Sequence, residues 1–119
     1  MFMARVVGCV WSSVKWKGLE GLRLLLVRPY NLDDLRASDG MTADDGVPPQ
    51  GLTDGVVVAD LLGAGPGEDV VIAYGHAGRV GLEPGLAVGE APHFPVDASV
   101  VAIVDRFRVD ESAIAGQTE

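Results

Sequence analysis

The sequence predicts an all-β fold: a small barrel of five short strands joined by long loops. Runs rich in valine, isoleucine and leucine occur five times, and glycine- or proline-rich stretches separate them. No segment combines the length and the 3.6-residue periodicity of a long helix. The chain has 119 residues, the size of one domain. An OB-like five-stranded β-barrel is the architecture that matches this size and this spacing of strands.

The expected strands follow one another at residues 3–12, 22–28, 56–62, 69–74 and 99–109. Gly8 lies in the middle of the first strand and predicts the bulge or bend with which small barrels close. Pro29 ends the second strand because proline has no N–H to donate to a ladder. Because hydrophobic residues make up 48% of the chain but aromatic residues only 6%, the core is expected to consist of small and branched side chains.

Two long connections interrupt the strands. Residues 31–55 are rich in Asp, Gly and Pro and predict a long excursion from the barrel, with a partial hairpin around Leu35 or Met41. Residues 75–98 form a second Gly/Pro-rich connection with room for one short helical turn.

The domain organisation that follows is one barrel domain, residues 1–109, and a polar C-terminal tail, residues 110–119. We expect the tail to be mobile unless a partner holds it. The N-terminal stretch lacks the features of a signal peptide, and no apolar run is long enough for a membrane helix. The single cysteine, Cys9, cannot form an internal disulfide and favours a reducing cytosol.

The charge balance bears on partners. The chain has nine Lys and Arg residues and 17 Asp and Glu residues, which give a formal net charge of −8. Nucleic-acid affinity depends mainly on basic side chains that displace counterions from phosphates, and anionic membranes attract the same side chains. An OB-type module for single-stranded nucleic acid is therefore the disfavoured alternative, although Trp11 and Trp16 could stack on bases. We expect these two tryptophans to be packing or subunit-interface residues.

A glycine-rich loop lies in residues 60–74, DLLGAGPGEDVVIAY. Gly63 and Gly65 fit the start of a Gly-x-Gly-x-x-Gly dinucleotide motif, but the third glycine position holds Glu68, and a strand rather than a helix is expected next. No Gly-Lys-Ser/Thr follows, so the Walker pattern is absent as well. The loop is better interpreted as a tight turn. Its glycine density suggests close approach of backbone to backbone, within the chain or between subunits.

Catalytic and metal-binding patterns are not found. His76 and His93 share no recognisable ligand spacing with Cys or carboxylate residues. Ser12 and Ser13 lack the context of a nucleophile elbow. We therefore expect no catalytic residue, no metal, no cofactor and no enzymatic activity.

Three blocks, in the same order, resemble one known family. In residues 4–30 the matching positions are Ala4, Val6, Gly8, Val10, Ser13, Lys15, Leu19, Gly21, Leu22, Leu24 and Leu25. In residues 59–75 they are Ala59, Asp60, Gly63, Ala64, Gly65, Gly67, Glu68 and Val70. In residues 95–109 they are Pro95, Asp97, Ala98, Val101, Ile103, Val104 and Asp105. Together these blocks resemble the EutN/CcmL family, the pentameric vertex proteins of bacterial microcompartments.

The resemblance implies a structural function. Members of this family are small β-barrels that assemble as cyclic pentamers, and five-fold units at the corners let a shell of six-fold units close. The implied partners are other copies of this chain and hexameric shell proteins, with neither nucleic acid nor membrane. The implied location is the microcompartment shell in the bacterial cytoplasm.

The resemblance also suggests a candidate site. We expect the glycine loop to lie near the five-fold axis and to contribute to a narrow pore, through Gly63, Ala64, Gly65, Pro66, Gly67 and Glu68. His76 and Arg79 are candidates for the rim of that pore. The alternative is an ordinary turn far from the axis. Residues 75–79, GHAGR, differ from the family's usual Gly-Ser-x-Ala-Arg, and residues 31–55 are longer than in compact members.

Overall fold

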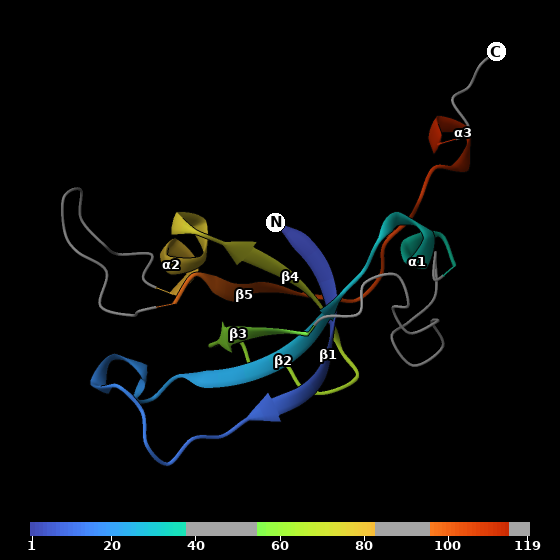
Figure 1. The fold of residues 1–119 in the computed structure, drawn as a ribbon. Coiled ribbons are helices and arrows are strands. Elements are labelled where there is room, and N and C mark those ends of the chain that lie inside the picture. Colours follow the sequence, from blue (N-terminus) through green and yellow to red (C-terminus); the bar gives the residue numbers. More distant parts are fainter. Residues whose placement is uncertain (38–54, 83–95, 115–119) are drawn as a thin grey trace.

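The computed structural model describes residues 1–37, 55–82 and 96–114. Five strands form a closed barrel in the order β1-β2-β3-β5-β4 (Figure 1). The strands are β1 (Phe2–Val10), β2 (Arg23–Pro29), β3 (Val56–Asp60), β4 (Asp69–Tyr74) and β5 (Ala98–Val104). The predicted all-β, OB-like five-stranded barrel is confirmed.

Strand pairing is antiparallel except between β3 and β5, which run parallel and join through Ala59 and Ser99. The register of β1 against β2 shifts between Val6 and Gly8. This confirms the irregularity expected at Gly8, and a second shift occurs in β4 between Val71 and Ile72. Such bulges add twist, which lets a sheet of only five strands curl onto itself.

The core fills the inside of the barrel with small and branched side chains, as the composition predicted. Its buried members are Ala4, Val6, Leu25, Val27, Val58, Ala64, Val70, Ile72, Ala98 and Val100. Nine of these residues come from the strands and alternate with outward-facing neighbours, as the two-residue period of a strand requires. The exception is Ala64, which lies in the glycine loop.

A buried polar cluster lies on the outside of β1 and β4. The guanidinium of Arg5 donates to Asp69 at 3.0 and 3.4 Å, and the hydroxyl of Tyr30 donates to the same carboxylate at 2.7 Å. All three residues are buried. Burial, followed by the hydrogen bond to Asp69, raises the pKa of Tyr30 well above its usual value, so the phenol is neutral at physiological pH.

The region expected to hold a hairpin around Leu35 instead forms α1 (Leu32–Ala37), so that prediction is wrong. The amide of Asp34 donates to the side chain of Asn31 at 2.8 Å, and the amide of Asn31 donates to the side chain of Asp34 at 3.0 Å. This reciprocal pair is a capping box, which satisfies amides that a helix start would otherwise leave without partners. Met41, the other candidate for a hairpin, lies outside the described residues.

Helix α2 (His76–Leu82) confirms the short helical segment expected between residues 75 and 98. It packs on β4 and β5, and the Ser99 hydroxyl donates to the carbonyl of Gly78 at 2.6 Å. A Cβ at Gly78 would lie 2.9 Å from the carbonyl oxygens of both Ala73 and Asp97. Glycine at this position therefore allows the helix to lie directly against the strands.

Beyond β5 the chain leaves the barrel. The last strand ends at Val104, before the expected end at residue 109, and α3 (Glu111–Ile114) follows in the segment assigned to the tail. Arg36 of α1 binds Glu111 through several hydrogen bonds of 2.7 to 3.1 Å. None of the helices in the described parts of the chain is long and apolar enough to span a bilayer.

Candidate functional site

The glycine loop, residues 61–68, crosses one end of the barrel. It runs from the end of β3 to the start of β4, two strands that are not neighbours in the barrel order. The loop must therefore pass over the barrel opening to reach β4. Ala64 is fully buried and belongs to the core cluster, so this loop closes that end of the barrel.

Asp60 fixes the first half of the loop. Its carboxylate accepts hydrogen bonds from the amides of Leu62, Gly63 and Ala64 at 2.9, 3.1 and 3.0 Å. Arg23 of β2 donates to the same carboxylate at 3.1 Å and to the carbonyl of Ala64 at 2.5 Å. Three amides and one guanidinium thus compensate a carboxylate that is fully buried.

Sequence reasoning did not select Asp60 or Arg23 as site residues. From the sequence, Asp60 was identified only as a position that matches the family. The available signal was its place at the end of a strand and before a glycine turn, where Asp side chains bind backbone amides two residues onward. No local signal indicated Arg23, because it lies 37 residues from Asp60 in the sequence.

The second half of the loop pairs with β1. The amide of Gly67 donates to the carbonyl of Val6 at 2.8 Å, and the amide of Val6 donates to the carbonyl of Glu68 at 2.9 Å. The side chain of Glu68 turns back and accepts the amide of Gly65 at 2.7 Å. The loop is therefore held at both ends, by β2 through Arg23 and by β1 through Val6.

The three glycines of the loop differ in what each requires. Gly63 and Gly67 have φ of 86° and 92°, in the left-handed region that side chains disfavour. Gly65 has no positive φ, and a Cβ there would meet only the Glu68 carboxylate, at an ordinary 3.7 Å. Within the described protomer, backbone conformation accounts for Gly63 and Gly67, whereas neither conformation nor close packing accounts for Gly65.

The candidate rim residues lie elsewhere. His76 and Arg79 belong to α2, which follows β4, whereas the glycine loop precedes β4. The length of β4 separates the two groups by roughly 17 Å along the strand. His76 is exposed, and Arg79 has a buried Nε with no hydrogen-bond partner among the residues that the structure describes. The structure therefore brings Gly63 to Glu68 together in one loop but does not add His76 and Arg79 to it.

The element that follows the loop and the carboxylates near it bear on which ligands the loop could hold. The loop leads into strand β4 rather than into a helix, as predicted, so it does not form the N-terminus of a helix. Among the described residues, no three His, Cys, Asp or Glu side chains cluster closely enough to hold a metal ion. What the geometry does provide is a rigid backbone turn, exposed at Gly63, Pro66 and Gly67, on a closed barrel.

The tryptophans near the β1–β2 connection lie on the surface. Trp11 is 86% exposed and Trp16 is 66% exposed. Of the two roles expected for them, packing within the protomer is therefore wrong, because most of the surface of each side chain is exposed. The role in a subunit interface stays a prediction.

Comparisons of the sequence with known proteins agree on one family. The model of the family described as ethanolamine utilisation protein EutN/carboxysome matches residues 1–105. The bacterial microcompartment shell vertex protein GrpN of Rhodospirillum rubrum is 33% identical over 105 residues, covering 88% of this chain and 93% of GrpN. The carboxysome shell vertex protein CcmL of Synechococcus elongatus is 31% identical over 119 residues, covering 100% of this chain and 98% of CcmL.

Solved structures show the same relationship. The pentameric microcompartment shell protein GrpN from Rhodospirillum rubrum superposes with a TM-score of 0.64 at 29% identity, covering 92% of this chain and all of GrpN. CcmL of Gloeobacter violaceus superposes with a TM-score of 0.63 at 31% identity, covering 92% of this chain and 91% of that protein. The family match over nearly the whole chain and the shared barrel lead to one conclusion: the chain belongs to the EutN/CcmL family.

Proposed function

We propose that this chain is a structural shell protein whose pentamers occupy the vertices of a bacterial microcompartment. The observation that carries the proposal is the match, over 88% to 100% of the chain, to relatives described as shell vertex proteins. One solved relative is described as a pentameric shell protein. We further propose that hexameric shell proteins surround the pentamer and that the shell lies in the bacterial cytoplasm.

The physical basis of this function is geometric. A head-to-tail contact between unlike surfaces closes into a ring only when the rotation between neighbours divides a full turn. The subunit must therefore hold its two contact surfaces at a constant angle. A closed barrel, with its end sealed by a loop that Asp60 and Arg23 anchor, is rigid enough to do so.

We also propose that the glycine loop lies near the five-fold axis. Gly65 supports this placement, because neither its conformation nor its neighbours in the protomer require glycine. Five copies of one loop around an axis approach closely, and a missing side chain permits that approach. The proposal covers residues 63–68 alone, because His76 and Arg79 lie at the other end of β4.

Native mass spectrometry tests the oligomer directly. We expect the wild-type chain to appear as five copies of the 12.4 kDa subunit. A monomer, a dimer or a hexamer at micromolar concentration would contradict the proposed vertex function.

The substitution Gly65→Leu tests the placement of the loop. The side chain is compatible with the protomer, so we expect the subunit to fold but the yield of pentamer to fall by about tenfold or more, as overpacking at a close contact predicts. The control is Ala77→Leu, which puts the same side chain at an exposed position on α2, at the other end of β4, and should leave the pentamer intact. If both variants form pentamers as well as the wild type does, the loop lies away from the axis.

A further inference from the structure

The chain keeps the pattern of a strand beyond the last residue that pairs in the barrel. Strand β5 ends at Val104, but exposed and partly buried residues alternate from Arg106 to Asp110, with the two-residue period of extended backbone. Figure 1 shows this stretch leaving the barrel, passing α1 and ending at α3. No strand in the described parts of the chain pairs with it. We name residues 106–109, which read RFRV, the arm.

Both ends of the arm are held in place. At one end, β5 is paired with β4 in the barrel. At the other end, the carboxylate of Asp110 accepts hydrogen bonds from the amide and the hydroxyl of Ser112 at 3.0 and 2.6 Å, which caps the start of α3. Glu111 of α3 is bound by Arg36 of α1. The arm is therefore positioned in advance, which lowers the entropy cost of binding to it.

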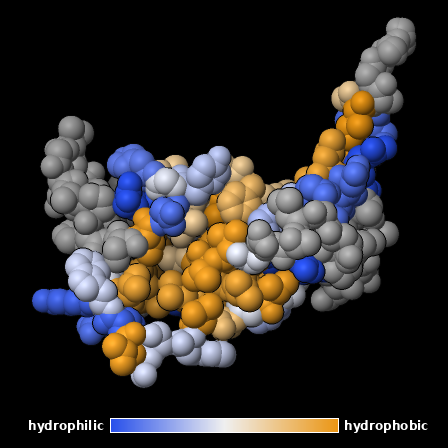
Figure 2. Space-filling model, viewed as in Figure 1, coloured by the Kyte–Doolittle hydropathy of each residue, from blue (hydrophilic) through white to orange (hydrophobic). Residues whose placement is uncertain are grey.

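The two sides of the arm differ in character. Arg106 and Arg108 are exposed, whereas Phe107 and Val109 between and after them are partly buried. Figure 2 shows hydrophilic and hydrophobic residues side by side along the segment that projects at the upper right. Residues two apart on an extended chain lie on the same side, roughly 7 Å from one another. The arm thus presents two guanidinium groups in a row.

These two guanidinium groups have no carboxylate of their own. Three arginines elsewhere in the described parts of the chain bind carboxylates: Arg5, Arg23 and Arg36. Arg106 and Arg108 bind none of the described carboxylates. The acidic residues that follow the arm are already engaged, Asp110 as a cap and Glu111 with Arg36. On a chain with a net charge of −8, the arm therefore offers two positive charges to a partner.

Membership of the family does not account for the arm. The family model matches residues 1–105 and ends just before it. The barrel is closed by strands that all end before the arm begins. The alternating pattern and the two free arginines therefore need an explanation that belongs to this chain.

We infer that the arm binds an extended acidic segment of another protein, which adds to it as a β-strand. In this mode of recognition, backbone hydrogen bonds provide affinity and alternate side chains provide specificity. Arg106 and Arg108 each bind one of two carboxylates at alternate positions of the segment, because a guanidinium matches a carboxylate with two parallel hydrogen bonds. Single-stranded nucleic acid is disfavoured, since two cations on a chain of charge −8 release few counterions. The inference does not depend on the pentamer.

A designed peptide tests the arm in the full chain. The probe is a capped, fluorescein-labelled heptapeptide, Thr-Glu-Val-Glu-Val-Glu-Thr, and its fluorescence anisotropy measures binding. We expect the version with Gln in place of each Glu to bind at least about tenfold more weakly, because it lacks the charges that the arm recognises. Equal binding of the two peptides, or no binding at about 1 mM of the Glu peptide, would overturn the inference.

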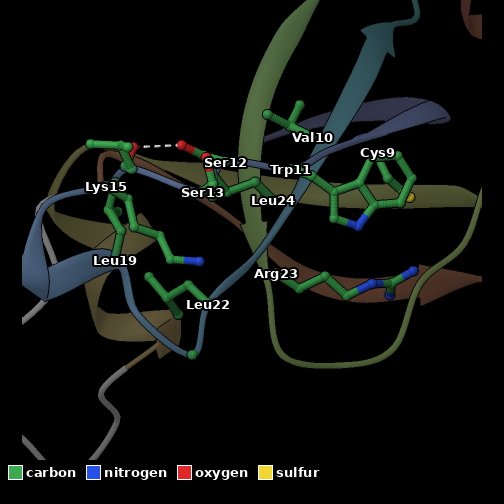
Figure 3. A pocket seen from close by; sticks show the side chains of 12 residues that line it. Cys9, Val10, Trp11, Ser12, Ser13, Lys15, Leu19, Leu22, Arg23 and Leu24 are labelled. Carbon is green, nitrogen blue, oxygen red and sulfur yellow. Dashed lines mark hydrogen bonds between the residues drawn. The ribbon is translucent and has the colours of Figure 1, made fainter.

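Two double variants locate the site. Arg106→Gln with Arg108→Gln should weaken binding of the Glu peptide by about tenfold or more, while circular dichroism shows an unchanged fold. The control Lys15→Gln with Lys17→Gln makes the same change in net charge at exposed positions of the β1–β2 connection, where Figure 3 shows Lys15. Its binding should stay within about twofold of the wild type. An equal loss in both double variants would show a response to overall charge and would overturn the assignment to the arm.

Methylated peptides test the addition of a strand. Alternate amides of a β-strand point to its neighbour, so N-methyl groups on one alternate set should abolish binding, whereas those on the other set should leave it intact. Two methylated peptides that both bind like the parent would overturn the strand geometry. An oligothymidylate that binds more tightly than the Glu peptide, and through the same two arginines, would overturn the acidic partner in favour of nucleic acid.

Discussion

At the scale of single residues, the fold depends on two buried carboxylates, those of Asp60 and Asp69. Asp60 is surrounded by three loop amides and Arg23, and Asp69 by Arg5 and Tyr30. An acidic side chain is buried at low cost only when charged or N–H partners satisfy its oxygens. These two residues therefore hold the loop and the β1–β4 pair through specific contacts that a neutral side chain cannot reproduce.

Replacement of Asp60 by asparagine should loosen the glycine loop. The Asn amide would place an NH₂ group against backbone N–H groups and would remove the charge that binds Arg23. We expect the free energy of unfolding to fall by about 2 to 4 kcal/mol, measured by urea denaturation at constant protein concentration. The control Asp97→Asn makes the same change at an exposed position and should shift stability by less than about 0.5 kcal/mol.

Replacement of Tyr30 by phenylalanine should remove a pH-dependent contribution to stability. The hydrogen bond to Asp69 is worth about 1 to 2 kcal/mol, so Tyr30→Phe should lower the free energy of unfolding by that amount, whereas the same change at exposed Tyr74 should not.

The sign of the pH effect follows from the pKa. Because burial and Asp69 raise the pKa of Tyr30 in the fold, the unfolded chain loses this proton first, near pH 10.0. The difference between wild type and Tyr30→Phe should therefore be constant below pH 10.0 and shrink as the pH rises further, in denaturation curves recorded across that range. A difference that grows with alkalinity would contradict the buried neutral phenol.

At the scale of secondary-structure elements, glycines set how closely elements approach. Gly63 and Gly67 give the β3–β4 loop its two left-handed residues, and Gly78 lets α2 lie against β4 and β5. Glycine thus allows a left-handed backbone conformation in the loop and close packing of the helix on the strands. Gly65 serves neither purpose within the protomer, and for that reason we assign it to the contact between subunits.

The substitution Gly78→Ala should destabilise the protein although alanine favours helices. The added Cβ would lie 2.9 Å from two backbone oxygens, which cannot move without shifting α2 from the strands. The expected loss of about 2 kcal/mol or more outweighs the roughly 1 kcal/mol of helix propensity that alanine gains. Ala77→Gly at the neighbouring exposed position is the control, with a loss of about 1 kcal/mol from propensity alone. A more stable Gly78→Ala protein in thermal denaturation would show that the helix has room to move.

At the scale of the whole molecule, the net charge opposes the assembly of several copies of this chain. Each subunit carries a formal charge of −8, so neighbours in a ring repel one another at low ionic strength. Screening of this repulsion by salt should therefore favour association.

Salt should therefore strengthen the pentamer. We expect its dissociation concentration to fall as sodium chloride rises from about 10 mM to about 300 mM, because the Debye length shortens from about 30 Å to less than 8 Å. Light scattering of a dilution series would measure this. Binding to a single-stranded oligonucleotide would show the opposite dependence, since it releases counterions. An assembly that dissociates as salt is added would show that ion pairs between subunits outweigh the repulsion between their net charges.

The sequence by itself determined the positions of the strands, the all-β class and the role of the glycine loop as a turn into a strand. These features have local causes. Branched residues favour strands, Pro29 ends a ladder, and Gly8 permits a bulge. None of these effects depends on contacts with distant parts of the chain. The sequence also contained the reciprocal cap of α1, Asn31 and Asp34, although a hairpin was expected there.

Only the tertiary structure decided which distant residues meet. Closure of the barrel brings Arg23 to Asp60 across 37 residues and Arg5 to Asp69 across 64. Closure also carries Ala64 into the core and separates His76 and Arg79 from the loop by the length of β4. These contacts depend on the order and register of all five strands together, which no short stretch of sequence encodes. The local sequence therefore specifies the strands and turns, whereas closure of the barrel determines which distant residues come into contact.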